Sequence, residues 1–341
     1  MSSFRTRGVA FTVLVAVVVG VTVVYLLVAA RSRGDLAAAT LPSTSPATTG
    51  RSDLEDPDGY IAFRRTTNDA AYGTVGTVPY DEPGALPAPR QHLSCERIHL
   101  SRRGGVCIDV DRAAVTTARV LLLEPDLTVR HTLSTPGIPS RARVSPDGRW
   151  AATTTFVFGH SYAGGRFSTQ TEIYDMVSGT SSGSLEKFQI SHRGKPYRAS
   201  DVNVWGVTFP ATGSSFYATI MTGGKKYLAK GLIDQRTIVM VDVAAECPSL
   251  SPSGELLAYK SATGPTTWEV KVRRLADGSE VVVETSRSVD DQIEWLDDGR
   301  VLFGLAPPGG GATADVWVAP ADGSRPAELL IRGAWSPAVV R

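Results

Sequence analysis

A short segment, Gly179–Gly183, has the Gly-x-Ser-x-Gly spacing of a nucleophile elbow. In that motif the serine sits on a tight turn between a strand and a helix, where its hydroxyl can attack a carbonyl carbon. The surrounding residues, 172–190, instead predict a strand, a polar turn and a second strand. The helix is missing, so we predict no catalytic residue here and no enzymatic activity for the chain.

The sequence also contains no strong motif for a metal site or a phosphate-binding site. None of the five histidines lies within five residues of another, so no histidine pair has a metal-ligand spacing. The acidic run at residues 289–299 lacks the alternating oxygen ligands of a calcium loop and is typical of two neighbouring turns. The Gly-rich segment 307–315 lacks the Lys-Ser/Thr ending of a phosphate loop. We therefore predict neither a metal nor a cofactor.

Two of the three cysteines, Cys95 and Cys107, lie close together in the sequence. In an exported protein they are a candidate disulfide, and closing so short a loop would contribute about 3 kcal/mol. Strand register opposes the pairing: if residues 102–105 form a hairpin turn, Cys107 faces Ile98–Leu100. The two sulfurs could then meet only if the chain bends back before the hairpin, and both outcomes stay open at this point.

The elements that carry these residues are short strands. From Tyr60 onward no amphipathic helix of ten or more residues is visible, and β-branched and aromatic runs alternate with Gly, Pro, Asp and Ser clusters. With 33 glycines, 21 prolines and 42% hydrophobic residues, the composition is that of a globular protein with many turns. The formal net charge of +1 argues against a nucleic-acid partner.

One strand–turn–strand unit recurs along the chain. Ala142–Trp150 reads ARVSPDGRW, and its relatives read PSLSPSGELLAY, IEWLDDGRVLFG, VTFPATGSSFYA and, more weakly, IHLSRRGGVCID. Proline presets φ for the second turn position, and glycine accepts the positive φ that often follows. The turn glycines are spaced by 44, 65, 41 and 45 residues. A period in the low forties predicts four-stranded propeller blades, one of them with an insertion of about twenty residues.

The two ends of this region complement each other. Ala334–Arg341 repeats only the front half of the unit, whereas Gly59–Thr66 and Tyr72–Asp81 have no first strand of their own. If these segments pair, the ring closes and its terminal edges are covered. We therefore predict an all-β fold, a six-bladed β-propeller over residues 59–341, closed by pairing of the N- and C-terminal strands.

The N-terminal residues predict a membrane anchor. Residues 9–30 are uncharged and apolar, enough to span about 30 Å of hydrocarbon as a helix. We predict a transmembrane helix or uncleaved signal anchor there, residues 1–8 in the cytoplasm, a Ser/Thr/Pro-rich linker over 31–58, and the propeller outside the cytoplasm at the cell membrane. The alternative is a signal peptide cleaved before Arg31, which would give a secreted protein.

The segments VSPDGRWAA, LSPSGELLAY and WLDDGRVLFG, each followed by a further strand, resemble the repeats of the TolB-type propeller. Over about residues 60–341 the chain resembles TolB-like proteins of high-GC actinobacteria that carry a signal peptide or anchor. The resemblance implies a six-bladed hub that binds proteins in the cell envelope. The sequence lacks the smaller α/β domain that precedes the TolB propeller, so a role in a translocation assembly is not carried over.

A binding face follows from propeller geometry. Loops that join second to third strands, and loops that enter each blade, lie on one face, opposite the repeated turns. These loops mix the residue types of protein interfaces, although long polar loops are as often merely solvated. The candidate binding residues are His160, Tyr162, Arg166, Arg198, Asp290 and Asp291.

Two classes of function fit these features. The first is a membrane-anchored, extracytoplasmic propeller that binds an envelope protein or a cell-wall component, and it is the one we expect. The alternative is a lactonase-like or lyase-like propeller enzyme with a channel metal, or a small-ligand sensor. On the predicted inner strands, Glu294 is the plain acidic candidate for such a metal.

Overall fold

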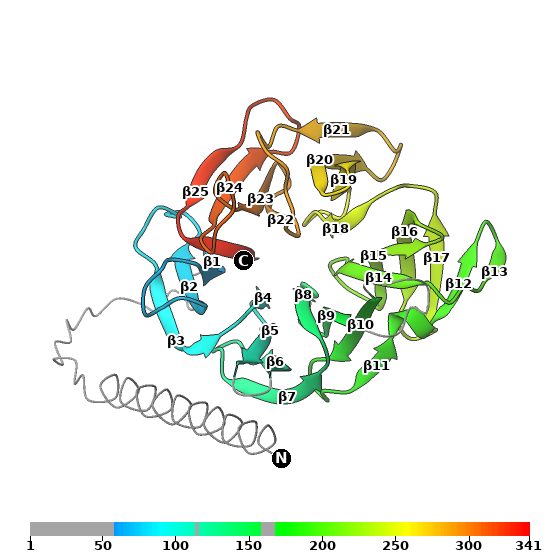
Figure 1. The fold of residues 1–341 in the computed structure, drawn as a ribbon, viewed down its shortest axis with the longest axis horizontal. Helices are drawn as coiled ribbons and strands as arrows, with labels where there is room; N and C mark the ends of the chain where they lie inside the picture. Colours follow the sequence, from blue (N-terminus) through cyan, green and yellow to red (C-terminus); the bar gives the residue numbers. More distant parts are fainter. Residues whose placement is uncertain (1–57, 113–115, 158–167) are drawn as a thin grey trace, which may run out of the picture. The chain divides into compact units, whose positions relative to one another are not determined.

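The computed structural model describes residues 58–112, 116–157 and 168–341. Within these ranges the chain forms β-strands and one short 3-10 helix, η2 (Leu185–Lys187). The strands make six sheets around a central axis (Figure 1). The described residues are therefore a six-bladed β-propeller, as the repeat predicts.

Five blades come from consecutive strands, with the first strand of each nearest the axis (Figure 1). Blade II comprises β4 (Arg97–Ser101), β5 (Gly104–Asp111), β6 (Thr117–Leu123) and β7 (Val129–Thr135). Blade III comprises β8 (Ile138–Val144), β9 (Trp150–Val157), β10 (Ser168–Asp175) and β11 (Ser181–Ser184). Blade V comprises β18 (Glu246–Leu250), β19 (Leu256–Gly264), β20 (Thr267–Arg274) and β21 (Glu280–Val283). Blade VI comprises β22 (Glu294–Asp297), β23 (Arg300–Leu305), β24 (Asp315–Pro320) and β25 (Glu328–Ile331).

Blade IV carries the insertion. Its four regular strands are β14 (Asn203–Thr208), β15 (Ser215–Thr222), β16 (Lys225–Leu232) and β17 (Thr237–Val241). A hairpin of β12 (Gln189–His192) and β13 (Lys195–Tyr197) extends this sheet, with β12 pairing in parallel with β17. Part of the insertion that the long repeat interval predicts is thus a hairpin on the outer edge of this blade.

Blade I closes the ring. Its inner strand is β26 (Ala334–Val340), and its outer strands are β1 (Tyr60–Arg65), β2 (Thr74–Pro79) and β3 (Ala88–Ser94). Strand β1 pairs antiparallel with β26, with Tyr60 opposite Val340. The predicted pairing of the two chain ends is confirmed.

The repeated turn has the predicted chemistry. Gly148 N–H donates to the Ser145 carbonyl at 2.8 Å, and Gly148 adopts a φ of 69°. Asp147 accepts hydrogen bonds from the Ser145 hydroxyl and the Arg149 N–H, which fixes the turn from within. The copy at Ser251 repeats the first of these bonds, with Gly254 N–H donating at 2.9 Å. These residues are turn formers on the face opposite the blade-entry loops.

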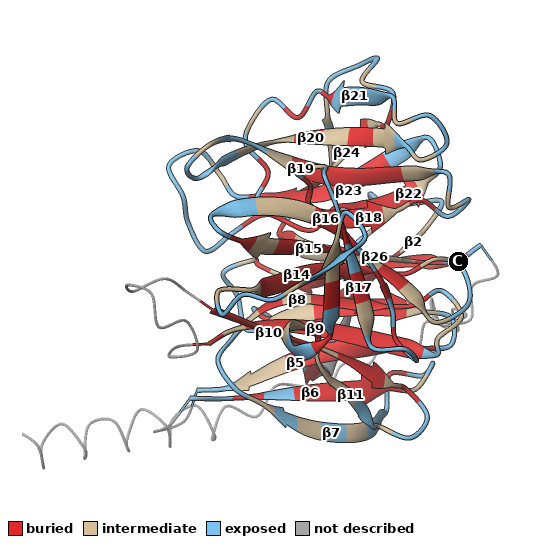
Figure 2. Ribbon diagram, turned by 90° about the vertical axis from the view of Figure 1, so that its right-hand side faces the viewer, coloured by how far each residue is buried: buried red, intermediate tan, exposed pale blue. Residues whose placement is uncertain are grey.

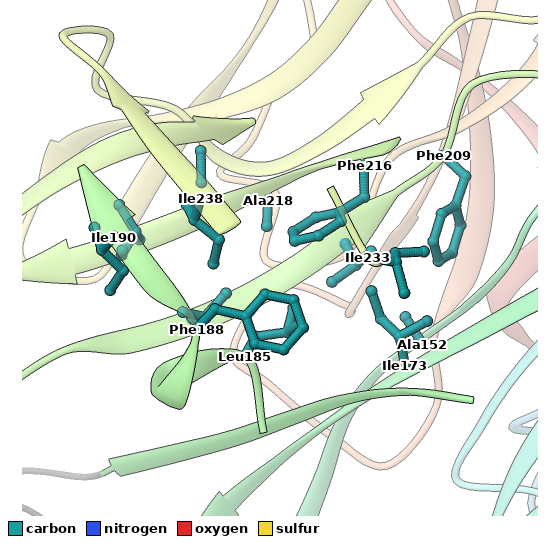
Figure 3. Packing of buried hydrophobic residues seen from close by; sticks show 14 of the residues in the cluster. Ala152, Ile173, Leu185, Phe188, Ile190, Phe209, Phe216, Ala218, Ile233 and Ile238 are labelled. Atoms are coloured by element: carbon teal, nitrogen blue, oxygen red, sulfur yellow. The ribbon is translucent and has the colours of Figure 1, made fainter. Parts of the chain in front are cut away.

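The core lies between and within the blades, and burial is deepest in the strands nearer the axis (Figure 2). The largest apolar cluster joins blades III and IV. In it Phe188 meets Phe216 edge to face, with ring centroids 6.5 Å apart (Figure 3). Leu185 of η2 is fully buried in the same cluster, so the segment that leads to the inserted hairpin is packed into the core.

The structure links Cys95 to Cys107 by a disulfide, with Cα atoms 5.5 Å apart. Cys107 does face Ile98 across the β4–β5 hairpin, as the register argument predicts. The chain nevertheless bends before β4, where Glu96 N–H donates to the Ile108 carbonyl at 2.8 Å. This bend returns Cys95 to the hairpin and satisfies the condition for the bridge, while Cys247 stays a free, buried thiol.

The predicted cytoplasmic segment, membrane helix and most of the linker, residues 1–57, lie outside the described residues. Among the residues that are described, no helix is long and apolar enough to cross a membrane.

Candidate functional site

The six inner strands place alternate side chains toward the axis, because successive residues of a strand point to opposite sides. On β4 these positions include Arg97 and His99, and on β8 they include Arg141 and Arg143. Glu294 enters from β22. Charged side chains from different blades therefore meet in the channel.

A buried ion pair closes the channel. The Arg143 guanidinium of blade III donates to the Glu294 carboxylate of blade VI, on the opposite side of the ring. Arg143 also donates to the Ile293 carbonyl at 2.8 Å and to the Ser249 hydroxyl at 3.3 Å. His99 Nε2 lies 3.1 Å from the same carboxylate. We call Arg143, Glu294, His99 and Ser249 the channel plug.

The tautomer of His99 follows from its neighbours. Val144 N–H donates to His99 Nδ1 at 3.1 Å, so Nδ1 is an acceptor and the proton of a neutral ring sits on Nε2, which lies 3.1 Å from Glu294 and 2.8 Å from Arg143 Nη1. A proton on Nδ1 would instead face the Val144 N–H, a second donor. Burial and the charge of Arg143 both lower the pKa of His99. The ring is therefore neutral at physiological pH.

Glu294 is fully ionised. Its burial alone would raise the carboxyl pKa, but the charges and hydrogen bonds of Arg143 and His99 lower it to about 2. The plug is thus a paired, hydrogen-bonded set, and Glu294 is committed to it.

Two further guanidiniums lie above the plug, toward the blade-entry face. Arg97 Nε donates to the Ser140 carbonyl at 2.6 Å, and Arg141 donates to the same oxygen at 2.8 Å. Burial, reinforced by the charge of Arg141, lowers the pKa of Arg97 to about 10. Both guanidiniums therefore remain cationic at neutral pH, and Arg97 also lies over the Trp335 ring at 5.9 Å.

A chain of charges continues from Arg141 along the rim of blades V and VI. The exposed Asp290 carboxylate accepts from the buried Lys260 ammonium at 2.6 Å and lies 3.5 Å from Arg141. The Lys260 ammonium sits 4.4 Å from the Trp268 ring centroid. Trp268 and Lys226 both donate to Glu246, at 2.6 and 2.5 Å. We call Arg97, Arg141, Asp290, Lys260 and Trp268 the channel mouth.

Five of the six predicted binding residues fall into three groups. Asp290 lies in the channel mouth, with a side chain 65% exposed. Arg198 is exposed directly after β13, on the inserted hairpin. The remaining loop candidates, His160, Tyr162 and Arg166, lie outside the described residues.

Asp291 corrects the expectation that it projects from a surface loop. It is only 1% exposed, and its carboxylate accepts from the Gly304 N–H at 3.1 Å. Glycine at 304 leaves room for this contact, because a Cβ there would lie 2.9 Å from the same oxygen. Asp291 therefore belongs to the wall of the channel and is not available to a partner.

Sequence reasoning missed the arginines that dominate the site. The signal was present: Arg97-x-His99 and Arg141-x-Arg143 repeat the same i, i+2 spacing at equivalent places in two inner strands. Both pairs must point along one side of their strands. In a ring of inner strands that side is the channel.

The opposite end of the channel is also hollow. A cavity of about 230 Å³ opens on the face of the repeated turns and reaches His99, Arg143 and Glu294 from below. Its rim includes Pro146 and Pro252 of two repeated turns. The channel plug thus separates this cavity from the channel mouth. Within the described ranges, no three His, Cys, Asp or Glu side chains are grouped so that they could hold a metal ion.

No protein-family model matches the sequence, and no curated protein does. Solved structures do. TolB from Acinetobacter baumannii matches with a TM-score of 0.58 at 14% identity, covering 83% of this chain and 67% of that one. The fold is that of a TolB-like six-bladed β-propeller. This likeness concerns the fold, because the identity is low.

Two enzymes also match the propeller, with lower scores. A puromycin-hydrolyzing peptidase from Mycobacterium tuberculosis has a TM-score of 0.48 at 12% identity, covering 76% of this chain and 41% of that one. An oligogalacturonate lyase from Vibrio parahaemolyticus has a TM-score of 0.44 at 11% identity, with coverages of 78% and 79%. The prediction that the chain is not an enzyme is contradicted, because the solved structures that match include these two enzymes.

Proposed function

We propose that this TolB-like propeller is a binding module whose channel mouth receives a partner protein. The observation that carries the proposal is the exposed Asp290 carboxylate, held between Lys260 and Arg141 in the channel mouth. Arg and Trp side chains flank it, and these residue types dominate the energetic centres of protein interfaces. The channel plug lies beneath them, so the channel mouth is a charged surface over a buried ion pair.

The channel mouth is preorganised. Lys260 is 2% exposed and is held by both Asp290 and the Trp268 ring, so its ammonium cannot swing away. Arg141 is fixed by the Ser140 carbonyl. Little side-chain entropy is lost when such groups meet a partner, which favours affinity.

The test is capture of a partner by the full-length chain from membranes of its host, after crosslinking. Asp290→Asn removes the exposed charge, and Trp268→Ala removes an aromatic anchor. We expect each variant to capture at least about tenfold less partner, in line with interface anchors. Asp322→Asn, an exposed aspartate in a turn on the opposite face, is the matched control. Equal capture by all four proteins would place the interface elsewhere.

We also propose that residues 9–30 anchor the chain in the membrane, that residues 31–58 form the linker, and that the propeller lies outside the cytoplasm as an envelope protein. The Cys95–Cys107 disulfide supports this location, because such bonds persist in oxidising compartments. Protease added to intact spheroplasts should remove the propeller. A protected propeller with three reduced thiols would contradict the proposal.

A further inference from the structure

A second, larger hollow lies away from the channel. It is a shallow depression of about 760 Å³ between the inserted hairpin of blade IV and blade V. Its lining comes from His192 and Arg193 at the tip of the hairpin, from Lys225–Tyr227 at the start of β16, from Asp242–Ala244 and from Ala262 of β19. Among the described blades only blade IV has such a hairpin, so we call this feature the hairpin groove.

The hairpin groove is cationic. Arg193, Lys225 and Lys226 line it, and Asp242 is the one carboxylate among its described lining residues. Asp242 is already engaged, since it accepts from His192 Nε2 at 2.7 Å and from Arg193 Nε at 2.9 Å. The hydrogen bonds from His192 and Arg193 lower the pKa of Asp242, so it stays ionised and holds both side chains in place.

Positive charge remains after these pairings. Arg193 uses only Nε for Asp242, and its side chain is 76% exposed, which leaves its terminal amino groups free to face the groove. Lys226 is paired with Glu246. The Lys225 ammonium is exposed and contacts no acidic side chain within the described part of the chain. Arg193 and Lys225 therefore both line the groove, and among the described residues neither the Lys225 ammonium nor the terminal amino groups of Arg193 contact an acidic side chain.

An aromatic surface lies beside these cations. Tyr227 lines the groove, packs against the blade IV core, and meets His192 in a T-shaped contact with ring centroids 5.3 Å apart, which fixes the tyrosine ring. Gly224 also lines the groove, with a φ of 71° and open space where a Cβ would be, so a ligand can approach the backbone closely. A fixed aromatic ring next to two cationic donors suits a sugar ring that carries a carboxylate.

We infer that the hairpin groove binds an acidic polysaccharide, with uronate carboxylates on Arg193 and Lys225 and a sugar ring on Tyr227. Because the groove is shallow and open to solvent, it need not enclose a polysaccharide chain that is longer than the groove. This site shares no lining residue with the channel mouth but adjoins it, because Lys226 of the groove and Trp268 of the mouth both donate to Glu246. Its ligand is of a different chemical class from the protein partner proposed above.

The experiment titrates the full-length chain with alginate oligosaccharides by calorimetry. We expect saturable binding that weakens with added salt, and a loss of about two- to fivefold in affinity for each of Lys225→Gln and Arg193→Gln, the usual range for exposed charge pairs. Tyr227→Leu keeps the charges and should also weaken alginate binding. Arg325→Gln, an exposed arginine on the turn between β24 and β25, is the matched control and should bind like the parent.

Inorganic polyphosphate and neutral dextran complete the design. We expect no binding of dextran. Polyphosphate should bind more weakly than alginate, and its affinity should be the same for Tyr227→Leu as for the parent. No saturable alginate binding, or equal affinity in the groove variants and Arg325→Gln, would overturn the inference, and so would equal binding of alginate and polyphosphate. Asp290→Asn should leave alginate binding unchanged, and Lys225→Gln should leave partner capture unchanged, so the two proposals fail separately.

Discussion

Arg143 and Glu294 meet across the channel from opposite blades of the six-bladed ring, and their ion pair is buried on both sides. A contact of this kind ties together two sheets that share no hydrogen-bonded strand edge. The ion pair therefore links blades III and VI across the channel. His99 of blade II contacts its carboxylate, and Ser249 of blade V accepts from its guanidinium.

Removing one partner of this pair should cost more than removing both. Glu294→Gln leaves the Arg143 charge buried without its carboxylate, and we expect the free energy of unfolding to fall by about 3–5 kcal/mol. The double variant Arg143→Met/Glu294→Leu replaces the pair by apolar groups and should recover most of that loss. Urea unfolding of the three proteins measures the difference. A double variant as unstable as Glu294→Gln would show that the pair is needed for more than charge balance.

Acid should destabilise the propeller in two stages. The pKa of His99 is lowered from 6.5 in the folded state, and that of Glu294 is lowered from 4.5 to about 2. The unfolded chain therefore binds more protons than the folded chain, so stability falls as the pH falls. The first stage lies below about pH 6.5 and the second between about pH 4.5 and 2. Unfolding free energies measured from pH 8 to pH 3 should show both.

Two variants test this explanation of the pH dependence. His99→Gln should flatten the stage just below pH 6.5 and leave the lower one in place. Burial raises the pKa of Glu186, so this carboxyl binds its proton more readily in the folded state and opposes the acid effect above pH 4.5. Glu186→Gln should therefore steepen the dependence on pH. A parent profile that is flat between pH 7 and 3 would contradict the assignment.

The disulfide should contribute to stability. Cys95→Ser/Cys107→Ser opens a loop with a sequence separation of 12 residues and should lower the free energy of unfolding by about 3 kcal/mol. A thiol reductant should shift the parent by a similar amount and leave the double variant unchanged. Two additional reactive thiols in the unreduced, denatured parent would mean that the bond is not formed.

Closure of the ring can be probed at a single glycine. Gly59 has a φ of 96°, and a Cβ there would lie 2.1 Å from the Val340 carbonyl oxygen, next to the β1–β26 pair. Gly213 has nearly the same φ, 98°, but open space around it. Both alanine variants should lose about 1 kcal/mol to backbone strain, and Gly59→Ala about 1–3 kcal/mol more to the clash. Thermal melts of the two variants measure the extra loss of stability that the clash with Val340 causes in Gly59→Ala. Equal losses in both variants would contradict this prediction.

Much of the fold was predictable because its determinants are local. Gly148 needs a positive φ wherever the turn forms, and Asp147 satisfies that turn from within, so the unit can be recognised without its surroundings. Its period then counts the blades. The paired chain ends followed from the front half of the unit at Ala334 and the missing first strand before Tyr60.

The site was less predictable because its contacts are long-range. Arg143 and Glu294 are 151 residues apart, and only the diameter of the ring decides that their side chains meet. Asp290 and Asp291 are neighbours in one acidic run, yet the first is exposed and the second is buried by the Gly304 N–H. Their residue type alone does not predict which of the two is buried. The inserted hairpin had a signal in the 65-residue interval, but its parallel pairing with β17 depends on packing of Leu185 and Phe188.

The pairing of β1 with β26 also predicts the order in which the blades form during folding. Blades II to VI are each formed by strands that are near neighbours in sequence, whereas blade I needs strands from the two ends of the described chain. Non-local pairs form late, since the entropy of closing the intervening chain must be met first. Amides of β1 should therefore gain protection from hydrogen exchange after those of β5 or β15 during refolding, and simultaneous protection would refute this order. A propeller emerging from synthesis is thus an open arc until its last strand arrives, and during that interval β1 exposes an unpaired edge that a chaperone can cover.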